Sequence, residues 1–247
     1  MTVVLIHGGG HSSRCWEPML PFIDTPALAI DLPGRGSRPG ELDKIRLEDF
    51  VAAAVQDLQR YTDGDVVLVG HSMAGITIPG VLERAHELIR HVILVSCAIP
   101  RDGTNLLSLF SQQIQEAAAL VQPTPAGTTR TEDEVLSGQA YDMSDAQAQF
   151  TLNVVVPETY WPIREPVSLA GFEHPVRRTW VKLTGDHTFP PELQTEMALR
   201  AGCVDVVEID SGHMAMVSHP RDLARVINAI GRGARDVDGS SGDAANG

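Results

Sequence analysis

Cysteine is scarce in this chain, and the three residues present, Cys15, Cys97 and Cys203, follow no spacing typical of a metal or redox site. An odd and scattered set of this kind does not predict a disulfide framework. The sequence also contains no His-Glu-x-x-His segment, and its histidines lack the spacing of metal ligands. We therefore expect no metal centre, and no cofactor is implied.

Positive charge and long apolar runs are also in short supply. Lysine and arginine number 19 against 32 acidic residues, a formal net charge of -13, which makes nucleic acid or an anionic membrane surface a poor partner. No apolar run approaches the length of a membrane span. A first strand beginning at Thr2 or Val3 leaves no room for a signal peptide. We expect a cytoplasmic protein.

Short apolar runs alternate with helical patterns, as in a parallel sheet whose strands are joined by crossover helices. With 247 residues, 43% of them hydrophobic, the chain can bury one sizeable core. We expect strands over residues 3–6, 26–31, 66–69, 91–95, 179–183 and 203–209, and helices over 47–61, 73–89 and 221–230. Pro79 should end or kink the second helix unless the first turns of the helix absorb it. The pattern predicts an α/β protein.

A glycine-flanked serine follows the buried strand at residues 66–69. The segment from Gly70 to Gly75 has the layout of a nucleophile elbow, in which a tight strand-to-helix turn leaves the serine projecting from the sheet. Ser72 is therefore a candidate covalent nucleophile. Ala74 stands where the usual pattern has glycine, and we expect the turn to accommodate its single methyl group.

A serine nucleophile needs a base, and the base needs an anion to hold it. Asp186 follows the strand expected at 179–183, and His213 follows the strand expected at 203–209. The carboxyl ends of parallel strands meet at one edge of a sheet, so both residues should lie near Ser72. We predict His213 as the base and Asp186 as the acid.

The first strand runs into three consecutive glycines, Gly8 to Gly10. Backbone amides on such a loop can stabilise an oxyanion, and we expect the Gly9 amide to do so together with that of Met73. A phosphate-binding loop is the alternative. It is disfavoured because no Gly-Lys-Ser/Thr follows and the Gly-x-Gly-x-x-Gly spacing is missing.

Residues 100–176 interrupt the alternating pattern. Prolines punctuate short helical pieces there, and one helical stripe runs from Leu106 to Val121. We interpret this segment as a lid that excludes water and shapes the pocket, the alternative being a purely structural helical hairpin. Its apolar surface could also pair subunits into a homodimer. Aromatic candidates for the pocket wall are Phe110, Tyr141, Phe150, Tyr160 and Trp161.

These motifs together resemble the α/β-hydrolases, and within them the plant methylesterase and hydroxynitrile lyase group with its bacterial esterase relatives. The matching segments are His7 to His11 with Cys15 and Trp16, Asp31 to Gly36, the serine turn, Gly185-Asp186, and His213 to Met216 with Pro220; Tyr141 to Asp145 is a weaker match. The resemblance covers roughly residues 1–230. It implies a mostly parallel central sheet flanked by helices, with a helical lid inserted before the strand that carries the catalytic acid.

Two positions separate the branches of that group. The lyases carry a threonine just after the first-strand histidine and a lysine just after the catalytic histidine. This chain has Gly8 and Met214 there, so the resemblance implies the esterase branch. His11 matches a histidine of the group and could reach the pocket.

Other residues compete for the same roles. His7 and His71 are better explained as structural, and His187 is a weak rival for the base because its side chain and that of the adjoining Asp186 should point apart. The rival acids are Asp102, Asp205 and Asp210.

The sequence thus predicts a serine esterase that cleaves a small carboxylic ester or lactone through Ser72, His213 and Asp186. The residues expected to contact substrate are Gly8, His11, Phe110, Tyr141, Trp161 and Met214. We expect a core of residues 1–99 and 177–231, a lid of 100–176 and a disordered tail of 232–247. A lyase, thioesterase, cyclase or carbon–carbon hydrolase using the same three residues, or a non-catalytic binding protein, remains as an alternative.

Overall fold

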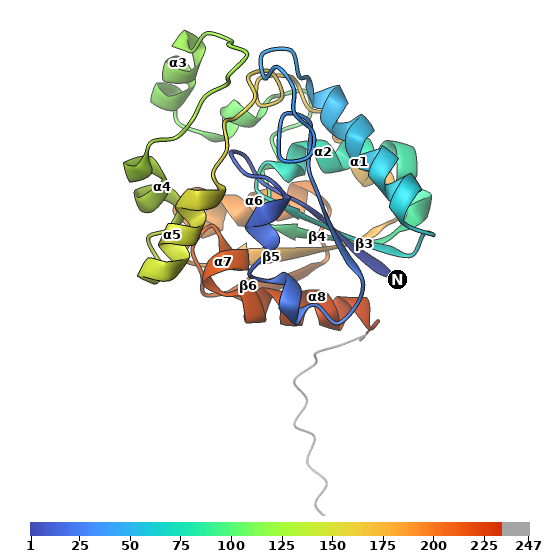
Figure 1. Ribbon diagram of the computed structural model, residues 1–247. Helices are drawn as coiled ribbons and strands as arrows, with labels where there is room; N and C mark the ends of the chain where they lie inside the picture. The colour runs from blue at the N-terminus through green and yellow to red at the C-terminus, as the bar shows by residue number, and fades with distance from the viewer. Residues whose placement is uncertain (234–247) are drawn as a thin grey trace, which may run out of the picture.

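A single sheet of six parallel strands organises the part of the chain that the computed structural model describes, residues 1–233 (Figure 1). The strands are β1 (Thr2–Ile6), β2 (Ala27–Ile30), β3 (Val66–His71), β4 (Ile89–Val95), β5 (Arg177–Leu183) and β6 (Asp205–Ile209). Their order across the sheet is β2-β1-β3-β4-β5-β6, and every neighbouring pair is parallel. The prediction of a parallel sheet with flanking helices is confirmed.

Helices cover both faces of the sheet and build two apolar cores (Figure 1). One face carries α1 (Leu47–Tyr61), α2 (Ala74–Ala85) and α6 (Pro191–Arg200). The other carries η1 (Ser13–Trp16), α7 (Ala215–Ser218) and α8 (Pro220–Gly231). The inner strands β1, β3 and β4 are almost wholly buried because helices cover both of their faces, whereas the edge strands β2 and β6 are largely unburied. Short 3-10 turns complete the core at η2 (Leu20–Phe22), η3 (His86–Leu88) and η5 (Ala170–Glu173).

Helix α2 is shorter than the pattern predicts, and Pro79 lies inside it rather than at its end. An interior proline costs a helix about 3 kcal/mol or more. Nearly all of α2 is buried, and Gly171 of η5 lies so close to it that an added Cβ would be 1.9 Å from the Pro79 carbonyl oxygen. Packing on both sides outweighs the lost hydrogen bond. Residues after Ala85 form η3 and then β4.

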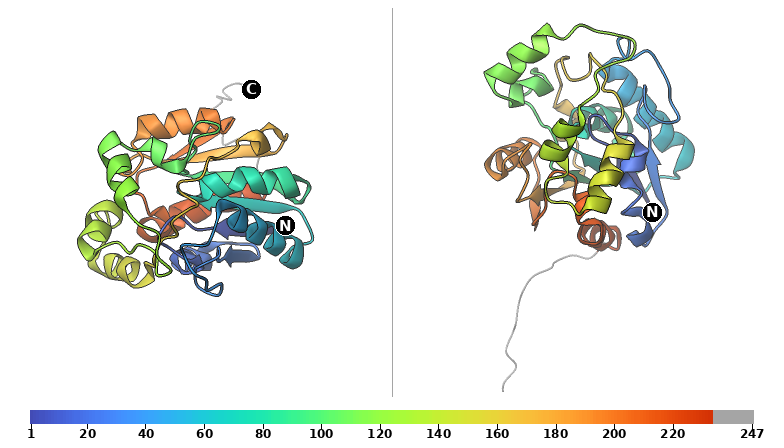
Figure 2. Two further views of the ribbon diagram at one scale, coloured as in Figure 1. Left: turned by 90° about the horizontal axis from the view of Figure 1, so that it is seen from above. Right: turned by 60° about the vertical axis from the view of Figure 1, so that its left-hand side comes forward.

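The insertion between β4 and β5 contains η4 (Leu106–Leu109), α3 (Gln112–Leu120), α4 (Glu132–Gln139) and α5 (Asp145–Val154). The three α-helices gather beyond one end of the sheet (Figures 1 and 2). A single helical stripe over 106–121 is wrong, because Ser111 caps a new helix by accepting the Ile114 amide at 3.4 Å. Helix α3 has no buried residue, and Leu120 is 81% exposed.

The predicted tail lies outside the described residues except for residues 232 and 233. In residues 1–233, no helix combines the length and the apolar character needed to cross a membrane.

His91 is buried at the end of the sheet opposite Ser72, and its burial makes the folding stability depend on pH. It lies near the start of β4, beside Arg177 of β5, and burial followed by the Arg177 charge lowers its pKa to about 4. Unfolding returns the pKa of His91 to about 6.5. Between about pH 4 and 6.5, His91 is therefore protonated in the unfolded chain and neutral in the folded chain. The stability from neutral His91 is therefore complete above pH 6.5 and is lost as the pH falls toward 4.

We expect the His91→Gln variant to lose this dependence while keeping a side chain that can bond Thr179, as the His91 Nε2 does at 2.8 Å. Between pH 6.5 and 5, the free energy of unfolding of the wild type should fall by roughly 1.5 kcal/mol more than that of the variant. Urea unfolding at both pH values measures this difference. Equal pH slopes in the two proteins would contradict the role of His91.

Candidate active site

Ser72 occupies a strained turn between β3 and α2. Its φ of 52° lies in the left-handed region, which non-glycine residues seldom adopt. Its amide donates to the Val95 carbonyl at 3.1 Å, and its carbonyl accepts the Ala98 amide at 2.8 Å. The end of β4 and the segment after it therefore hold both sides of the strained residue. Strain maintained in this way is typical of functional sites.

The small residues around Ser72 are required by close packing. A Cβ on Gly75 would lie 2.4 Å from the Ala98 carbonyl oxygen, which is backbone and cannot move aside easily. A Cβ on Gly70 would lie 2.3 Å from Ile78 Cδ1 and 3.1 Å from the Ala74 Cβ. The methyl group of Ala74 fits because Gly70 leaves that space empty. The departure from the usual motif is therefore compatible with the turn.

The structure brings Ser72, His213 and Asp186 together from loops after three different strands. The His213 Nε2 lies 2.9 Å from the Ser72 Oγ, and its Nδ1 lies 2.7 Å from the Asp186 Oδ2. With Nδ1 protonated, the ring donates to Asp186 and offers Nε2 as the acceptor for the Ser72 proton. This is the hydrogen-bonded order that a serine nucleophile requires.

Asp186 is buried and accepts several further hydrogen bonds. The Ser96 Oγ donates to its Oδ2 at 2.6 Å, and the amides of Thr188 and Phe189 donate to its Oδ1 at 2.7 and 3.1 Å. Burial alone would raise the pKa of Asp186, but the His213 charge and these donors outweigh burial and hold the pKa below its usual range. Asp186 is therefore ionised and fixed in direction.

The two residues expected to supply oxyanion donors lie together at the cavity. Gly9 and Met73 both line the cavity above Ser72, and a Cβ on Gly9 would lie 3.4 Å from the Met73 sulfur. Neither amide donates a hydrogen bond to another atom among residues 1–233. Both donors are thus available to a bound molecule.

The cavity over Ser72 has a volume of about 320 Å³ and is lined by both apolar and polar residues. Beyond the residues above, its lining comprises His71, Leu106, Leu107, Phe110, Arg130, Glu134, Gly138, Gln139, Glu158, Ile163, Thr188 and Phe189. Most of these residues belong to the insertion. Of the aromatic residues expected at the wall, Phe110 is present, with its ring centroid 5.7 Å from that of Phe189.

Five residues expected to contact substrate lie outside the described lining of this cavity, namely Trp161, Met214, His11, Tyr141 and Gly8. Trp161 donates from Nε1 to the Asp43 carbonyl at 2.6 Å, and Met214 is fully buried in the core. His11 is buried with its Nδ1 3.0 Å from the Gly9 carbonyl oxygen, and burial and then Arg130 lower its pKa to about 3.

Tyr141, the fourth, anchors the acid loop instead of touching the cavity. Its hydroxyl donates to the Gly185 carbonyl at 2.6 Å and accepts the His187 amide at 2.9 Å. The next residue, Asp142, accepts the Gly212 amide at 2.6 Å. The insertion therefore holds the loops of both Asp186 and His213.

Gly8 lies directly against the serine turn. A Cβ there would meet the His71 Nδ1 at 2.8 Å and the Ser72 Cβ at 3.0 Å, so a larger residue would displace its neighbours. The His71 ring packs within the turn, with its Nε2 2.8 Å from the His213 carbonyl oxygen. His7 accepts the Leu32 amide at 3.2 Å, and burial lowers its pKa to about 4.

The rival acids bond elsewhere. Asp102 accepts the Leu169 amide at 2.8 Å, Asp205 pairs with Arg177, and Asp210 lies 3.2 Å from the Thr184 hydroxyl. The rival base His187 is exposed and stacks on Tyr141 with ring centroids 3.9 Å apart.

The chain matches the model of the alpha/beta hydrolase family over residues 3–226. It belongs to this family. Among curated relatives, norfluorocurarine synthase 1 of Strychnos nux-vomica is 24% identical over 92% of this chain and 94% of its own length. The putative chloroplastic methylesterase 14 of Arabidopsis thaliana is 24% identical over 92% of this chain and 71% of its own length. The resemblance to the plant methylesterase group is thereby confirmed.

Solved structures of alpha/beta hydrolases share the fold. An extracellular alpha/beta-hydrolase from a Paenibacillus species, described as sharing structural and functional homology with tobacco salicylic acid binding protein 2, superposes with a TM-score of 0.80. The two chains are 19% identical, and the match covers 92% of this chain and 97% of that one. At this identity the likeness shows the fold alone.

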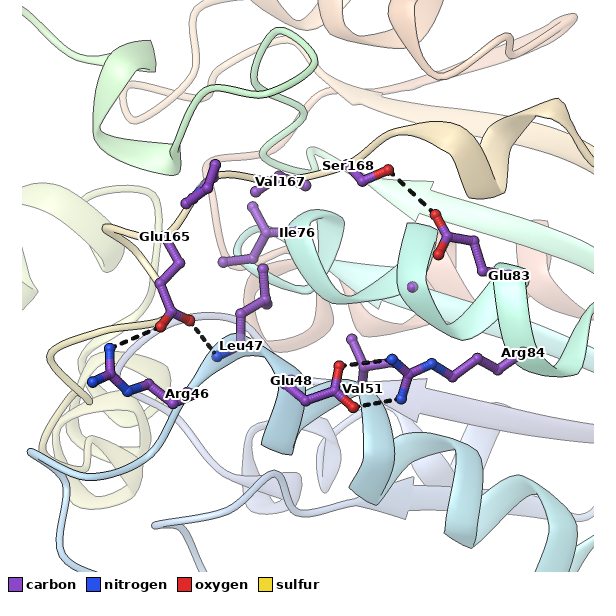
Figure 3. Close-up of a pocket in the computed structure, with 12 residues that line it drawn as sticks. Arg46, Leu47, Glu48, Val51, Ile76, Glu83, Arg84, Glu165, Val167 and Ser168 are labelled. Atoms are coloured by element: carbon purple, nitrogen blue, oxygen red, sulfur yellow. Dashed lines mark hydrogen bonds and ion pairs between the residues drawn. The ribbon is translucent and has the colours of Figure 1, made fainter.

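A larger hollow of about 530 Å³ in this alpha/beta hydrolase lies between α1, α2 and residues 165–168 (Figure 3). Four of its charged side chains form two ion pairs: Arg46 bonds Glu165 at 3.0 Å, and Arg84 bonds Glu48 at 2.6 and 2.7 Å. These pairs tie α1 to its neighbours. Since none of the proposed reacting groups lines this hollow, the smaller cavity over Ser72 is the better candidate for the chemistry.

Proposed function

We propose that the protein is a carboxylic ester hydrolase with Ser72 as nucleophile, His213 as general base and acid, and Asp186 as the anion that orients His213. The observation that carries the proposal is the continuous chain of hydrogen bonds from Ser72 through His213 to Asp186. Relatives named as esterases and methylesterases in rice and Arabidopsis support the reaction class.

The geometry supports a two-step acyl transfer. The Ser72 Oγ attacks the ester carbonyl carbon while the His213 Nε2 takes its proton, and the carbonyl electrons move to oxygen. The amides of Gly9 and Met73 stabilise that oxyanion. His213 then returns the proton to the leaving alcohol, and the acyl group stays on Ser72.

Water completes the cycle by the same route. His213 removes a proton from a water molecule, which attacks the acyl carbonyl, and the carboxylic acid leaves Ser72 as the serine regains its proton. Asp186 stabilises the positive imidazolium in both steps without itself being protonated. The inserted segment 100–176 would act as the lid, since it supplies most of the cavity wall.

The cavity favours small esters. Its volume of about 320 Å³ lies at the lower end of the range for ligand pockets, roughly 300 to 1,000 Å³. Leu106, Phe110 and Ile163 supply an apolar wall for an acyl or alcohol group. We expect acetyl to hexanoyl esters of p-nitrophenol to be hydrolysed well, and long-chain fatty acyl esters to be poor substrates.

A chain-length series of p-nitrophenyl esters tests this proposal. Serine-dependent turnover with a preference for short acyl groups is the expected result. A wild-type protein that reacts with a fluorophosphonate but cleaves none of these esters would contradict simple ester hydrolysis, and would favour a lyase or cyclase reaction by the same groups. Absence of both reactions would favour a binding protein.

We propose cytoplasmic localisation, although relatives are named chloroplastic and extracellular. A homodimer through the insertion is also proposed, because Ile114 and Leu120 of α3 are exposed.

A further inference from the structure

The glycine loop that carries the Gly9 amide has no side chains of its own to fix its shape. Gly8, Gly9 and Gly10 follow one another, and Gly10 has a φ of 70°. Glycine backbones reach many conformations at little cost, so a loop of three glycines needs contacts from outside to hold one of them. A preorganised oxyanion hole depends on such contacts.

The inserted segment supplies these contacts at both ends of one peptide group. The Gly10 amide donates to the Glu158 Oε2 at 2.7 Å, and the Gly9 carbonyl accepts from the Arg130 Nη1 at 3.2 Å. The Gly10 carbonyl accepts the Val156 amide at 2.8 Å. A rotated Gly9–Gly10 peptide would turn its carbonyl oxygen toward the Glu158 carboxylate, where like charges repel.

Glu158 is itself held firmly. Its Oε1 accepts hydrogen bonds from the Thr159 amide and hydroxyl at 2.7 and 2.8 Å, and it forms an ion pair with Arg35. The Arg35 side chain is completely buried beside the Phe50 ring. Burial alone would raise the pKa of Glu158, but Arg35 and the Thr159 bonds outweigh it and keep the pKa below its usual range. The carboxylate is therefore charged and immobile.

We propose that Glu158 is a positioning residue that holds the Gly9–Gly10 peptide so that the Gly9 amide faces the reacting carbonyl oxygen. This inference rests on the proposed ester hydrolysis. Glu158 acts through the loop, since its carboxylate is 2.7 Å from the Gly10 nitrogen and lines the cavity beside Gly9. Arg35 neutralises the carboxylate, which would otherwise oppose negative charge on the substrate. The oxyanion hole is thus completed by the inserted segment.

Two variants of Glu158 test the proposal. Glu158→Gln removes the charge, and Glu158→Asp keeps the charge for Arg35 but withdraws the carboxylate by one methylene from Gly10. We expect kcat for a short p-nitrophenyl ester to fall at least tenfold in both, with KM within threefold of the wild type. The inhibition constant of a butylboronic acid, which forms a tetrahedral adduct on a reactive serine, should rise by about the same factor as kcat falls.

The matched control is Glu132→Gln, which removes one charge from an exposed position of the same segment. It should leave kcat and boronic acid inhibition unchanged. Circular dichroism and thermal melting identify a variant that fails to fold, and Glu158→Asp carries the test if Glu158→Gln does so.

Folded Glu158 variants with kcat within threefold of the wild type would overturn the proposal. A fall in kcat with unchanged boronic acid inhibition would overturn it as well, because the oxyanion hole would then be intact. If the Ser72→Ala variant is inactive while both Glu158 variants are fully active, only the positioning role fails. If the wild type hydrolyses no ester, the proposed function itself fails.

Discussion

Replacing Ser72 by alanine should abolish ester hydrolysis and leave the fold intact. The side chain provides the attacking oxygen, and the removed hydroxyl bonds to the His213 Nε2 at 2.9 Å. Loss of a serine nucleophile in a comparable triad lowers kcat on the order of 10⁶-fold. Alanine retains the Cβ, so the backbone bonds of residue 72 to Val95 and Ala98 remain possible. Initial rates with a short p-nitrophenyl ester measure the loss.

The control for this variant is Ser168→Ala, which removes an exposed hydroxyl from the larger hollow between α1 and α2 (Figure 3). It should keep wild-type activity. If Ser72→Ala retained full turnover while Ser168→Ala lost it, the chemistry would belong to the larger hollow and the assignment of Ser72 would be wrong.

Replacing Asp186 by asparagine should have the second-largest effect. The amide keeps the size of the side chain but removes the charge that stabilises protonated His213, and it offers an N–H where Nδ1 now finds an acceptor at 2.7 Å. The equivalent change in a serine protease lowers kcat about 10⁴-fold by favouring the wrong tautomer. We expect a loss of this order in kcat, with KM nearly unchanged.

Asp102→Asn is the matched control, because Asp102 follows the neighbouring strand β4 and is the strongest rival acid. In the structure its carboxylate accepts the Leu169 amide at 2.8 Å and is exposed. Its replacement should leave kcat within about threefold. A large loss in Asp102→Asn with normal turnover in Asp186→Asn would reverse the assignment of the acid.

The arrangement of Ser72, Asp186 and His213 could be predicted because it depends on short-range pattern and on topology. Each residue follows a segment whose sequence indicates a strand, and the carboxyl ends of parallel strands converge at one edge of the sheet. No knowledge of side-chain packing is needed for that inference. By the same reasoning Gly9, three residues beyond the end of β1 at Ile6, is expected at this edge, and it lines the cavity over Ser72.

The cavity wall could not be predicted in the same way, because it is built from the insertion. Glu158 meets Arg35 across 123 positions of sequence and lies in an irregular segment with no periodicity. Nothing local distinguishes it from a surface glutamate. The one indication in the sequence is that Arg35 falls within Asp31 to Gly36, a segment that resembles the hydrolases.

Tyr141 and Trp161, which were expected at the pocket wall, lie outside the lining of the cavity for a related reason. Tyr141 and Trp161 are large and partly polar, so they suit a pocket wall, but each uses its polar tip to anchor a loop. Tyr141 bonds the loop of Asp186, and Trp161 bonds the Asp43 carbonyl. The residue type indicates that a buried tyrosine or tryptophan needs a hydrogen-bond partner. Which partner it binds depends on tertiary contacts, which the sequence pattern does not predict.

Covalent trapping of the nucleophile tests the central claim most directly. The wild-type protein is treated with a fluorophosphonate, digested, and examined by mass spectrometry for the modified peptide. The account predicts one rapidly formed adduct, on Ser72, which is absent from His213→Ala treated in parallel because the serine is no longer activated. An adduct on another residue, or an unmodified protein under conditions in which a known serine esterase is fully labelled, would contradict it.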